Sequence, residues 1–169
     1  MMNTDRLTIR PIANADLANI IPIHSDPLVN KYLPYETWEN EDDAKNWYEG
    51  VQKKQQEGLA QQFIIERRDD QTLVGTCILF RHDKKARTAE FGYVLGRNYW
   101  RQGLMIEAMT AFSNYLQNDL DIKTLSAVVD APNIKSIKLL ENLGFSQGTA
   151  SEEMSKENLL LFYRTAHKN

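Results

Sequence analysis

The residues between Arg97 and Ile106 are of types that suit binding of a pyrophosphate. Arg97 and Arg101 stand just before Gly103, and apolar residues then recur at helical spacing, so a helix should begin near Gly103. Arg101, Gln102 and Gly103 occupy the positions where Ser, Thr, Asp or Asn would cap that helix, so its first backbone N–H donors lack a side-chain acceptor. Free donors at the positive end of a helix dipole, beside arginine, favour a bound phosphate.

Two better known phosphate loops are absent from the sequence. No Gly-x-x-x-x-Gly-Lys-Ser/Thr string occurs, and a single glycine followed by Leu-Met-Ile cannot supply the glycine triplet of a dinucleotide fold. The alternative explanation of this segment is a tight strand-to-helix connection with water on its free amides.

The segment that must position this loop is an alternating strand from Arg87 to Gly96. Its odd-numbered positions carry Ala, Phe, Tyr and Leu, whereas Glu90, Gly92 and Val94 lie on the other face. A helix separates it from a second strand at Leu125–Val129, which makes the two strands expected parallel neighbours, with the ligand where they diverge. Gly92 marks either a bulge or space for a neighbouring ring such as Trp100 or Tyr93.

Other patterns predict the remaining elements. A polar helix should run from Asn40, its cap, to Glu57, with Gly58 past its end. The other expected elements are a strand at Arg6–Ile12, a short helix capped by Asn14 or Asp16 and extending to Ile23, a hairpin of Gln62–Glu66 with Leu73–Phe80, a helix at Ile134–Asn142 closed by Gly144, and a final strand pair of Phe145–Ala150 with Leu159–Tyr163.

Residues 99–108, Tyr-Trp-Arg-Gln-Gly-Leu-Met-Ile-Glu-Ala, resemble the acetyl-CoA motif of the GNAT N-acetyltransferases. The resemblance is to the branch that includes the RimJ/RimL-like protein N-terminal acetyltransferases, and it extends over nearly the whole chain. Residues 4–11 resemble the opening strand of that branch, residues 89–95 its central strand, and residues 133–145 its last helix and turn. The chain departs from the family at Met105, where Gly or Ala is usual, so a bulky side chain stands at the helix start.

The resemblance implies an α/β (α+β) fold of the GNAT acyl-CoA N-acyltransferase type in a single domain over residues 1–169. Its central sheet would be mixed and mostly antiparallel, with six to seven strands, about four flanking helices and a splayed parallel strand pair. The implied activity is transfer of the acetyl group of acetyl-CoA to a primary amine, with a protein N-terminal α-amino group as the favoured acceptor. The alternatives are acetylation of a small-molecule amine, polyamine or aminoglycoside, and a non-catalytic acyl-CoA-binding module.

The resemblance also assigns roles to residues of the site. Glu90 would be the general base, acting through a water, and Ser136 the acid for the thiolate, because Leu140 stands where many family members have a tyrosine acid. Without the family match, Glu90 would be a solvated or ion-paired strand residue, opposite Arg87 or another cation, and Asn133 a helix cap. The residues implied to bind acetyl-CoA are Tyr93, Val94, Leu95, Arg101, Gln102, Gly103, Leu104, Met105, Ile106 and Asn133.

The acceptor can be narrowed by the cost of deprotonating an amine. At pH 7 an α-amino group costs about 1 to 1.4 kcal/mol to deprotonate, whereas a lysine costs about 4.6 kcal/mol, so an N-terminal acceptor demands less of a base. Tyr32, Tyr35 and Trp38 lie in an irregular aromatic segment, His24–Glu39, which could line the acceptor cleft. The alternative is that their rings only pin a loop to the core.

Composition excludes several classes of protein. The 169 residues include 20 basic and 23 acidic ones, and a net charge of -3 offers no general attraction to nucleic acid or to an anionic membrane. Cys77 is the only cysteine, so neither an internal disulfide nor a cysteine zinc cluster can form. The three histidines, His24, His82 and His167, show no metal spacing and are expected to be ordinary surface or loop residues. The single cysteine and the lack of an apolar signal-peptide core at the start favour a cytoplasmic setting. We expect no bound metal, and the oligomeric state stays open between monomer and homodimer.

Overall fold

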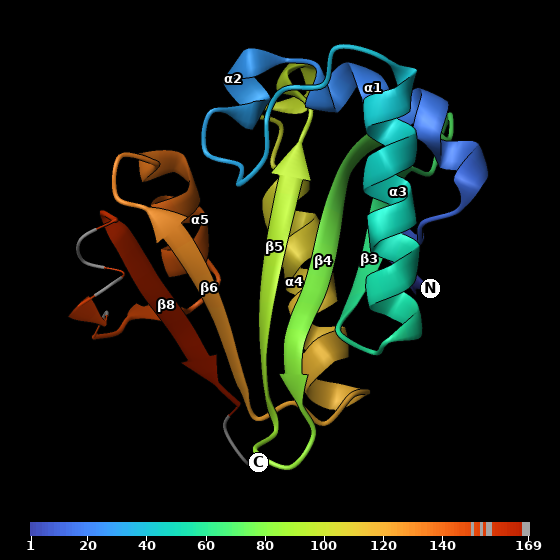
Figure 1. Ribbon diagram of the computed structural model, residues 1–169. Helices are drawn as coiled ribbons and strands as arrows, with labels where there is room; N and C mark the ends of the chain where they lie inside the picture. Colours follow the sequence, from blue (N-terminus) through green and yellow to red (C-terminus); the bar gives the residue numbers. More distant parts are fainter. Residues whose placement is uncertain (150, 153, 155–156, 167–169) are drawn as a thin grey trace.

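The structure is a computed structural model that describes residues 1–149, 151, 152, 154 and 157–166 (Figure 1). Most of the predicted elements are present, and the helix predicted at Ile134–Asn142 has the predicted bounds. The helices are η1 (Asn14–Asp16, a 3₁₀ helix), α1 (Leu17–His24), α2 (Pro27–Asn30), α3 (Glu41–Gln56), η2 (Arg97–Tyr99, a 3₁₀ helix), α4 (Leu104–Asn118) and α5 (Ile134–Asn142). The strands are β1 (Met2–Asn3), β2 (Leu7–Pro11), β3 (Ala60–Arg67), β4 (Leu73–Asp83), β5 (Thr88–Leu95), β6 (Thr124–Asp130), β7 (Ser146–Gln147) and β8 (Leu159–Thr165).

One sheet contains all eight of these strands, in the order β1-β2-β3-β4-β5-β6-β8-β7. Every neighbouring pair is antiparallel except β5 and β6, which are parallel as predicted. The strand count exceeds the predicted six to seven because β1 and β7 are two-residue strands with no pattern long enough to detect. Ala150, predicted in the strand that contains β7, lies outside the described residues. The mixed, mostly antiparallel sheet with its parallel pair confirms the expected fold class.

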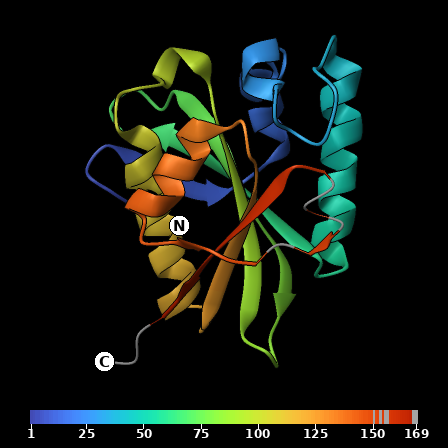
Figure 2. The same cartoon turned by 90° about the vertical axis from the view of Figure 1, so that its left-hand side faces the viewer.

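Helices cover both faces of the sheet, and each layer has its own apolar cluster. Figure 2 shows α4 and α5 on one face and α1 and α3 on the other. The larger cluster lies beneath α4 and α5 and includes Phe91 from β5 and Phe112 from α4. The smaller one lies beneath α1 and α3 and includes Ile20, Ile64 and Trp38. Because β5 alternates between the two layers, its odd-numbered side chains join the larger cluster and Val94 packs on the smaller one.

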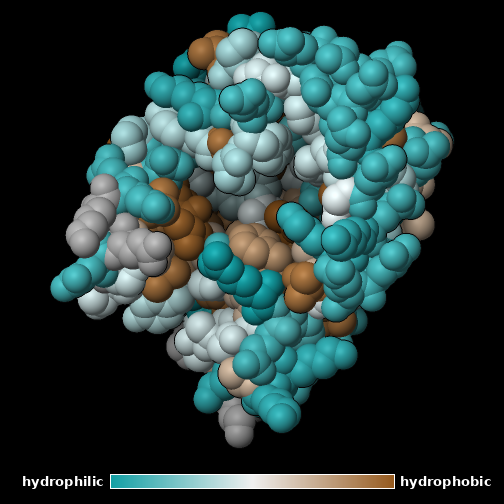
Figure 3. Space-filling view, viewed as in Figure 1, coloured by the Kyte–Doolittle hydropathy of each residue, from teal (hydrophilic) through white to brown (hydrophobic). Residues whose placement is uncertain are grey.

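The parallel strands β5 and β6 separate after three residue pairs. Thr88–Glu90 pair with Thr124–Ser126, and beyond Glu90 no further pair joins the two strands. The strands diverge from there toward the end of β5 (Figure 1), and the space-filling view of the same side is hollowed at its centre, with apolar residues beside the hollow (Figure 3). Past Glu90, β5 therefore has one edge without a strand partner, in the place where the ligand was predicted.

Gly92 does not mark a bulge, contrary to one expectation. The pairing of β4 with β5 is continuous from Gly75 to Phe80, and the register shifts only between Phe80 and Asp83 of β4. A Cβ at Gly92 would lie 3.3 Å from Ile78 Cγ2, so this glycine makes room for an isoleucine of the neighbouring strand and not for a ring. The divergence of β5 from β6 therefore needs no irregularity in β5 itself.

The caps of the first helices differ in how well the sequence predicted them. Asn40 caps α3 as expected, with its Oδ1 accepting from the N–H groups of Asp42 and Asp43. Asp16 stands at the N-cap position of α1 but does not cap it with its side chain, because its carboxylate accepts from the N–H of Ala13 at the start of η1 and pairs with Arg10 at 2.8 Å. Within the described part of the chain, no helix combines the length and the apolar character that crossing a bilayer requires.

Candidate active site

The loop before α4 presents free backbone N–H groups, as the sequence predicted. Gly103 stands at the N-cap position with φ +73° and provides no side-chain cap, and Arg101 also has a positive φ of 61°. Glu107 is the first residue of this region whose N–H has a backbone acceptor, the carbonyl of Gly103. The N–H groups of residues 101–106 have no hydrogen-bond acceptor among the described residues. Those donors, at the positive end of a 15-residue helix, form a cradle for an anion such as a pyrophosphate.

An arginine that the sequence did not single out holds this loop from behind. Arg6 donates from Nη1 to the Gln102 carbonyl at 2.9 Å and from Nε to Glu107 Oε2 at 2.6 Å. The same glutamate accepts from the Arg6 N–H and from the Thr4 hydroxyl, and these contacts hold the pKa of Glu107 below its usual value against the opposing effect of burial. Arg6 and Glu107 are 101 residues apart, so no local pattern could reveal the contact.

Two predicted cofactor residues of this loop point in different directions. Arg101 is exposed and makes no ion pair with a described residue, so its guanidinium is available to a phosphate. Met105 is only 9% exposed, because its side chain lies in the larger core cluster together with Leu104. The bulk that sets Met105 apart from the family pattern therefore fills the core, and its backbone N–H stays free in the cradle.

Tyr93 and Ser136 meet across the divergence of β5 and β6. The Tyr93 hydroxyl lies 2.6 Å from Ser136 Oγ, which places the first turn of α5 against the middle of β5. Burial raises the pKa of Tyr93 to about 12, partly offset by the hydrogen bond to Ser136. Asn133 caps α5, since its Oδ1 accepts from the Ser136 N–H at 3.3 Å. The sequence proposed both Asn133 and Ser136 as site residues but did not predict that Ser136 meets a tyrosine hydroxyl.

Glu90 lies at the last point where β5 and β6 pair, and it is 9% exposed. Its Oε2 accepts from Arg81 Nη1 at 2.7 Å. The ion-pair partner is therefore Arg81, from the neighbouring strand, whereas Arg87 pairs with Asp121. The guanidinium of Arg81 therefore occupies one carboxylate oxygen of Glu90. The residue also lies where the two strands begin to diverge.

The far end of β5 is held by the aromatic part of the loop. Trp100 donates from Nε1 to the Leu95 carbonyl at 2.8 Å, so this carbonyl of a predicted cofactor residue already has a donor. Lys135, at the start of α5, places its ammonium 4.2 Å from the centre of the Trp100 ring. With the contact of Tyr93 and Ser136, this cation–π pair ties α5 to the loop.

The three predicted acceptor-site aromatics occupy different environments. Tyr32 reaches across to the Pro132 carbonyl, 3.4 Å from its hydroxyl, and so lies at the end of β6 where α5 begins. Tyr35 contacts His24 Nδ1 at 3.2 Å. Trp38 is only 5% exposed and stacks on the His24 ring with centroids 4.4 Å apart, so it supports the segment from inside the smaller core and does not present a face to an acceptor. The prediction that Trp38 lines the acceptor cleft is therefore contradicted by its burial.

The prediction for His24 is also wrong, because this histidine is neither a surface nor a loop residue. It is the last residue of α1, is fully buried, and its Nε2 has no hydrogen-bond partner among the described residues. Burial lowers the pKa of His24 to about 4.

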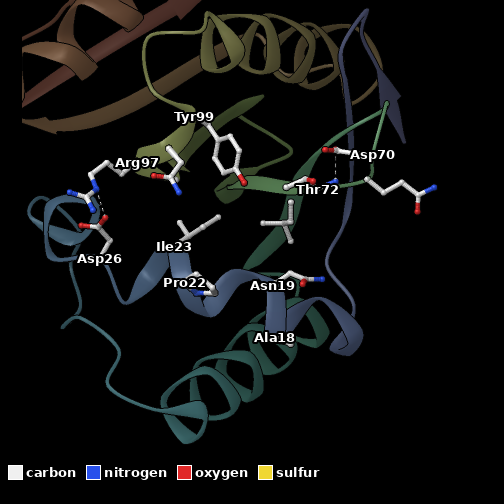
Figure 4. Close-up of a pocket in the computed structure, with 13 residues that line it drawn as sticks. Ala18, Asn19, Pro22, Ile23, Asp26, Asp70, Thr72, Arg97 and Tyr99 are labelled. Atoms are coloured by element: carbon white, nitrogen blue, oxygen red, sulfur yellow. Dashed lines mark hydrogen bonds and ion pairs between the residues drawn. The ribbon is translucent and has the colours of Figure 1, made fainter.

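A separate open pocket of about 570 Å³ lies between α1, the turn from β3 to β4, and η2 (Figure 4). The ion pair of Arg97 with Asp26, 2.7 Å long, lies on its rim, and Tyr99 points into the space between the elements. Arg97, which the sequence placed beside the phosphate loop, lines this pocket and is paired with Asp26, and none of the other predicted site residues lines it. It is therefore distinct from the opening between β5 and β6, which begins past Glu90 and is bordered by Tyr93 and Ser136.

Known proteins are similar to this chain over most of its length. Residues 6–146 match the family model described as Acetyltransferase (GNAT) domain. The chain is 32% identical over 163 residues to the Uncharacterized N-acetyltransferase p20 of Bacillus licheniformis, covering 96% of this chain and 86% of that protein. It is 25% identical over 169 residues to the [Ribosomal protein uS5]-alanine N-acetyltransferase of Escherichia coli (strain K12), covering 95% of this chain and 83% of that protein.

A solved structure shares the fold. The spermidine N-acetyltransferase from Vibrio cholerae, in complex with CoA and spermine, superposes with a TM-score of 0.82 at 20% identity, covering 96% of each chain. At this identity the likeness concerns the arrangement of the elements alone.

Proposed function

Because this chain belongs to the GNAT acetyltransferase family and is an acetyl-CoA-dependent N-acetyltransferase, we propose that its acceptor is the α-amino group of a protein N-terminus. The proposal rests on the ion pairing and burial of Glu90, the carboxylate beside the opening. Arg81 occupies one of its oxygens and most of the side chain is buried, so little of it is free to contact an acceptor directly. Glu90 would therefore act as a base through a water molecule. Such an indirect base suits an amine that is easily deprotonated.

The energetic difference between amines supports this choice. Deprotonation at pH 7 costs about 1 to 1.4 kcal/mol for an α-amino group and about 4.6 kcal/mol for a lysine-like amine. The similarity to a ribosomal-protein alanine N-acetyltransferase over 95% of the chain favours the same acceptor class.

The residues around the opening fit acetyl-CoA, which supplies an activated acetyl group and a thiolate leaving group when bound. We assign the diphosphate to the free N–H groups of residues 101–106, with Arg101 as the cationic partner. The unpaired edge of β5 around Tyr93 and Val94 offers backbone groups to the amide-bearing arm, and an N–H of that edge would stabilise the oxyanion. Asn133 holds the first turn of α5, which presents the hydroxyl of Ser136 for proton donation.

The test is an assay of thiol release with matched acceptors. We expect acetylation of peptides with a free N-terminal alanine or serine, and no acetylation of the same peptides with a blocked N-terminus and an internal lysine. Faster acetylation of spermidine, or equal acetylation of the blocked peptides, would overturn the proposal.

Substitution of the base gives an independent check. Glu90→Gln should lower kcat/KM for the peptide by about 100-fold, in the range of general-base catalysis. Glu66→Gln is the matched control, because Glu66 is another ion-paired strand glutamate, 3.0 Å from Arg10, but lies on β3 away from the opening. A Glu90→Gln enzyme as active as the control would exclude Glu90 as the base.

A further inference from the structure

Two hydroxyl groups from distant parts of the chain form a short hydrogen bond inside the proposed active site. The Tyr93 hydroxyl and Ser136 Oγ are 2.6 Å apart although their residues are 43 positions apart. Tyr93 lies on β5 just beyond its last pair with β6, and its ring packs against Phe91, with centroids 6.0 Å apart. The ring is therefore held in place by the core, and its hydroxyl reaches the residue assigned as the acid.

We propose that Tyr93 is a relay residue that acts through Ser136, supplying the proton that the Ser136 hydroxyl delivers to the departing thiolate of CoA. The inference rests on the proposed acetyl transfer but not on which amine is the acceptor. Either oxygen of the pair can be the donor, and in the relay Tyr93 donates to Ser136.

The proton balance of the step is complete. As the bond between the acetyl carbon and sulfur breaks, its electron pair goes to sulfur, which takes the hydroxyl proton of Ser136. The Ser136 oxygen takes the phenolic proton of Tyr93, and solvent reprotonates Tyr93 before the next turnover. The amine gives one proton to Glu90 or to water on becoming an amide, so one proton is released for each one delivered.

Acid strength explains why a second hydroxyl is needed behind the serine. An aliphatic hydroxyl is a very weak acid, comparable to water, so Ser136 alone is a poor source of a proton. A phenol is a stronger acid than an aliphatic hydroxyl, and Tyr93 remains the stronger acid of the pair although burial raises its pKa to about 12. Leu140, at the position of the family's tyrosine acid, is fully buried and can supply nothing. Tyr93 reaches the same site from a strand and not from the last helix.

A purely structural role would make the same contact without using the acidity of the phenol, so the test varies that acidity. Tyr93 is replaced by phenylalanine and, site-specifically, by fluorinated tyrosines of lower pKa. One readout is the pH titration of the thiol of bound CoA, followed by the ultraviolet absorbance of the thiolate without any amine present. The other is the pH dependence of kcat for whichever amine the enzyme accepts.

We expect Tyr93→Phe to lower kcat by about 10- to 100-fold, with the KM for acetyl-CoA changed less than about twofold, and to raise the pKa of the bound thiol. The fluorinated tyrosines should retain activity at neutral pH and move the alkaline limb of kcat toward lower pH in step with the phenol. A Tyr93→Phe enzyme with wild-type kcat and wild-type thiol titration would overturn the proposal. An alkaline limb that does not move with the phenol would reduce Tyr93 to a structural support of Ser136.

Tyr115→Phe is the matched control, because Tyr115 lies on α4 and packs against the same core cluster, away from the hydroxyl pair of Tyr93 and Ser136. It should leave kcat and the thiol titration unchanged. In the Tyr93→Phe/Ser136→Ala double variant, the loss should not exceed that of Ser136→Ala, as expected for residues in one relay. If peptides are rejected as acceptors, the thiol titration still decides the relay, so the two proposals can fail separately.

Discussion

At the scale of single residues, His24 is an ionisable group that folding places in an apolar setting. It closes α1, stacks on Trp38 and lies beside Tyr35, and its Nε2 is buried without a described partner. An imidazole in such a place is held neutral, because burial penalises the charged form. In the unfolded chain the same ring is exposed to water and can take up a proton near its ordinary pKa of 6.5. The stability of the protein is therefore linked to pH through this residue.

The sign of the linkage follows from the lowered pKa, 6.5 in the unfolded chain and about 4 in the folded protein. Between these values the unfolded chain binds the proton and the folded protein does not, so stability falls as the pH drops from about 7 toward 4. Between pH 7 and pH 5 the loss should be about 2 kcal/mol. Urea unfolding across this range should show the slope in the wild type and a much flatter one in His24→Phe.

The control is His82→Phe, at a histidine of β4, which should keep the wild-type slope. An unchanged pH dependence in His24→Phe would show that the folded protein does not hold His24 neutral.

At the scale of elements, the end of β5 is shaped by how closely β4 approaches it. Gly75 of β4 pairs with Leu95 of β5, and a Cβ on Gly75 would collide with the Val94 carbonyl oxygen. Backbone cannot move aside as the end of a flexible side chain can. This glycine is thus required by the close approach of the strand that carries the proposed cofactor-binding residues Val94 and Leu95.

Gly75→Ala should therefore lower the free energy of unfolding by about 2 kcal/mol or more, within the range of overpacking in a filled interior. It should also weaken acetyl-CoA binding, because Val94 and Leu95 must shift. Gly50→Ala is the control, since Gly50 lies inside α3 and a methyl group added there would meet no atom within 4 Å. There alanine should stabilise the helix by about 0.5–1 kcal/mol. Chemical denaturation measures the free energy of unfolding of both variants. Equal stability of Gly75→Ala and wild type would contradict the close-approach explanation.

At the scale of the whole molecule, the opening between β5 and β6 separates groups that we propose act on one ligand. The loop and Arg101 precede α4, Tyr93 is on β5, and Asn133 and Ser136 are at the start of α5. The contact of Lys135 with Trp100 and that of Tyr93 with Ser136 join the two sides above a shared apolar core. A ligand that engages both sides binds only the folded arrangement and so stabilises the whole molecule.

Acetyl-CoA at about 100 times its Kd should raise the free energy of unfolding by about 2.7 kcal/mol, which corresponds to a rise in Tm of about 5 to 10 °C for a chain of this size. Free ATP, which shares the adenine and phosphates but lacks the pantetheine arm, should raise Tm much less. In Gly103→Val the acetyl-CoA shift should be largely lost, because a β-branched residue is strained at a φ of +73° and its Cβ would lie 3.4 Å from the Arg6 guanidinium that holds the loop. No rise in Tm with acetyl-CoA in the wild type would contradict the assigned cradle.

Much of the fold and of the uncapped loop before α4 could be predicted from sequence, because those features are local. The cap at Asn40, the uncapped start of α4 at Gly103 and the bounds of α5 follow from neighbouring residues within one or two helical turns. The alternation of side chains along β5 likewise predicts Phe91 and Tyr93 on the core face, where both pack in the structure.

The tertiary structure alone decided which of those residues meet. The pairing of Tyr93 with Ser136, of Arg81 with Glu90 and of Arg6 with Glu107 joins different elements, and the burial of Trp38 and Met105 depends on what packs over them. Local sequence determines backbone conformation through steric preference and hydrogen bonds between near neighbours. The partner of a side chain depends on packing between segments that are distant along the chain, and their relative placement is set only when the sheet and its two helical layers assemble.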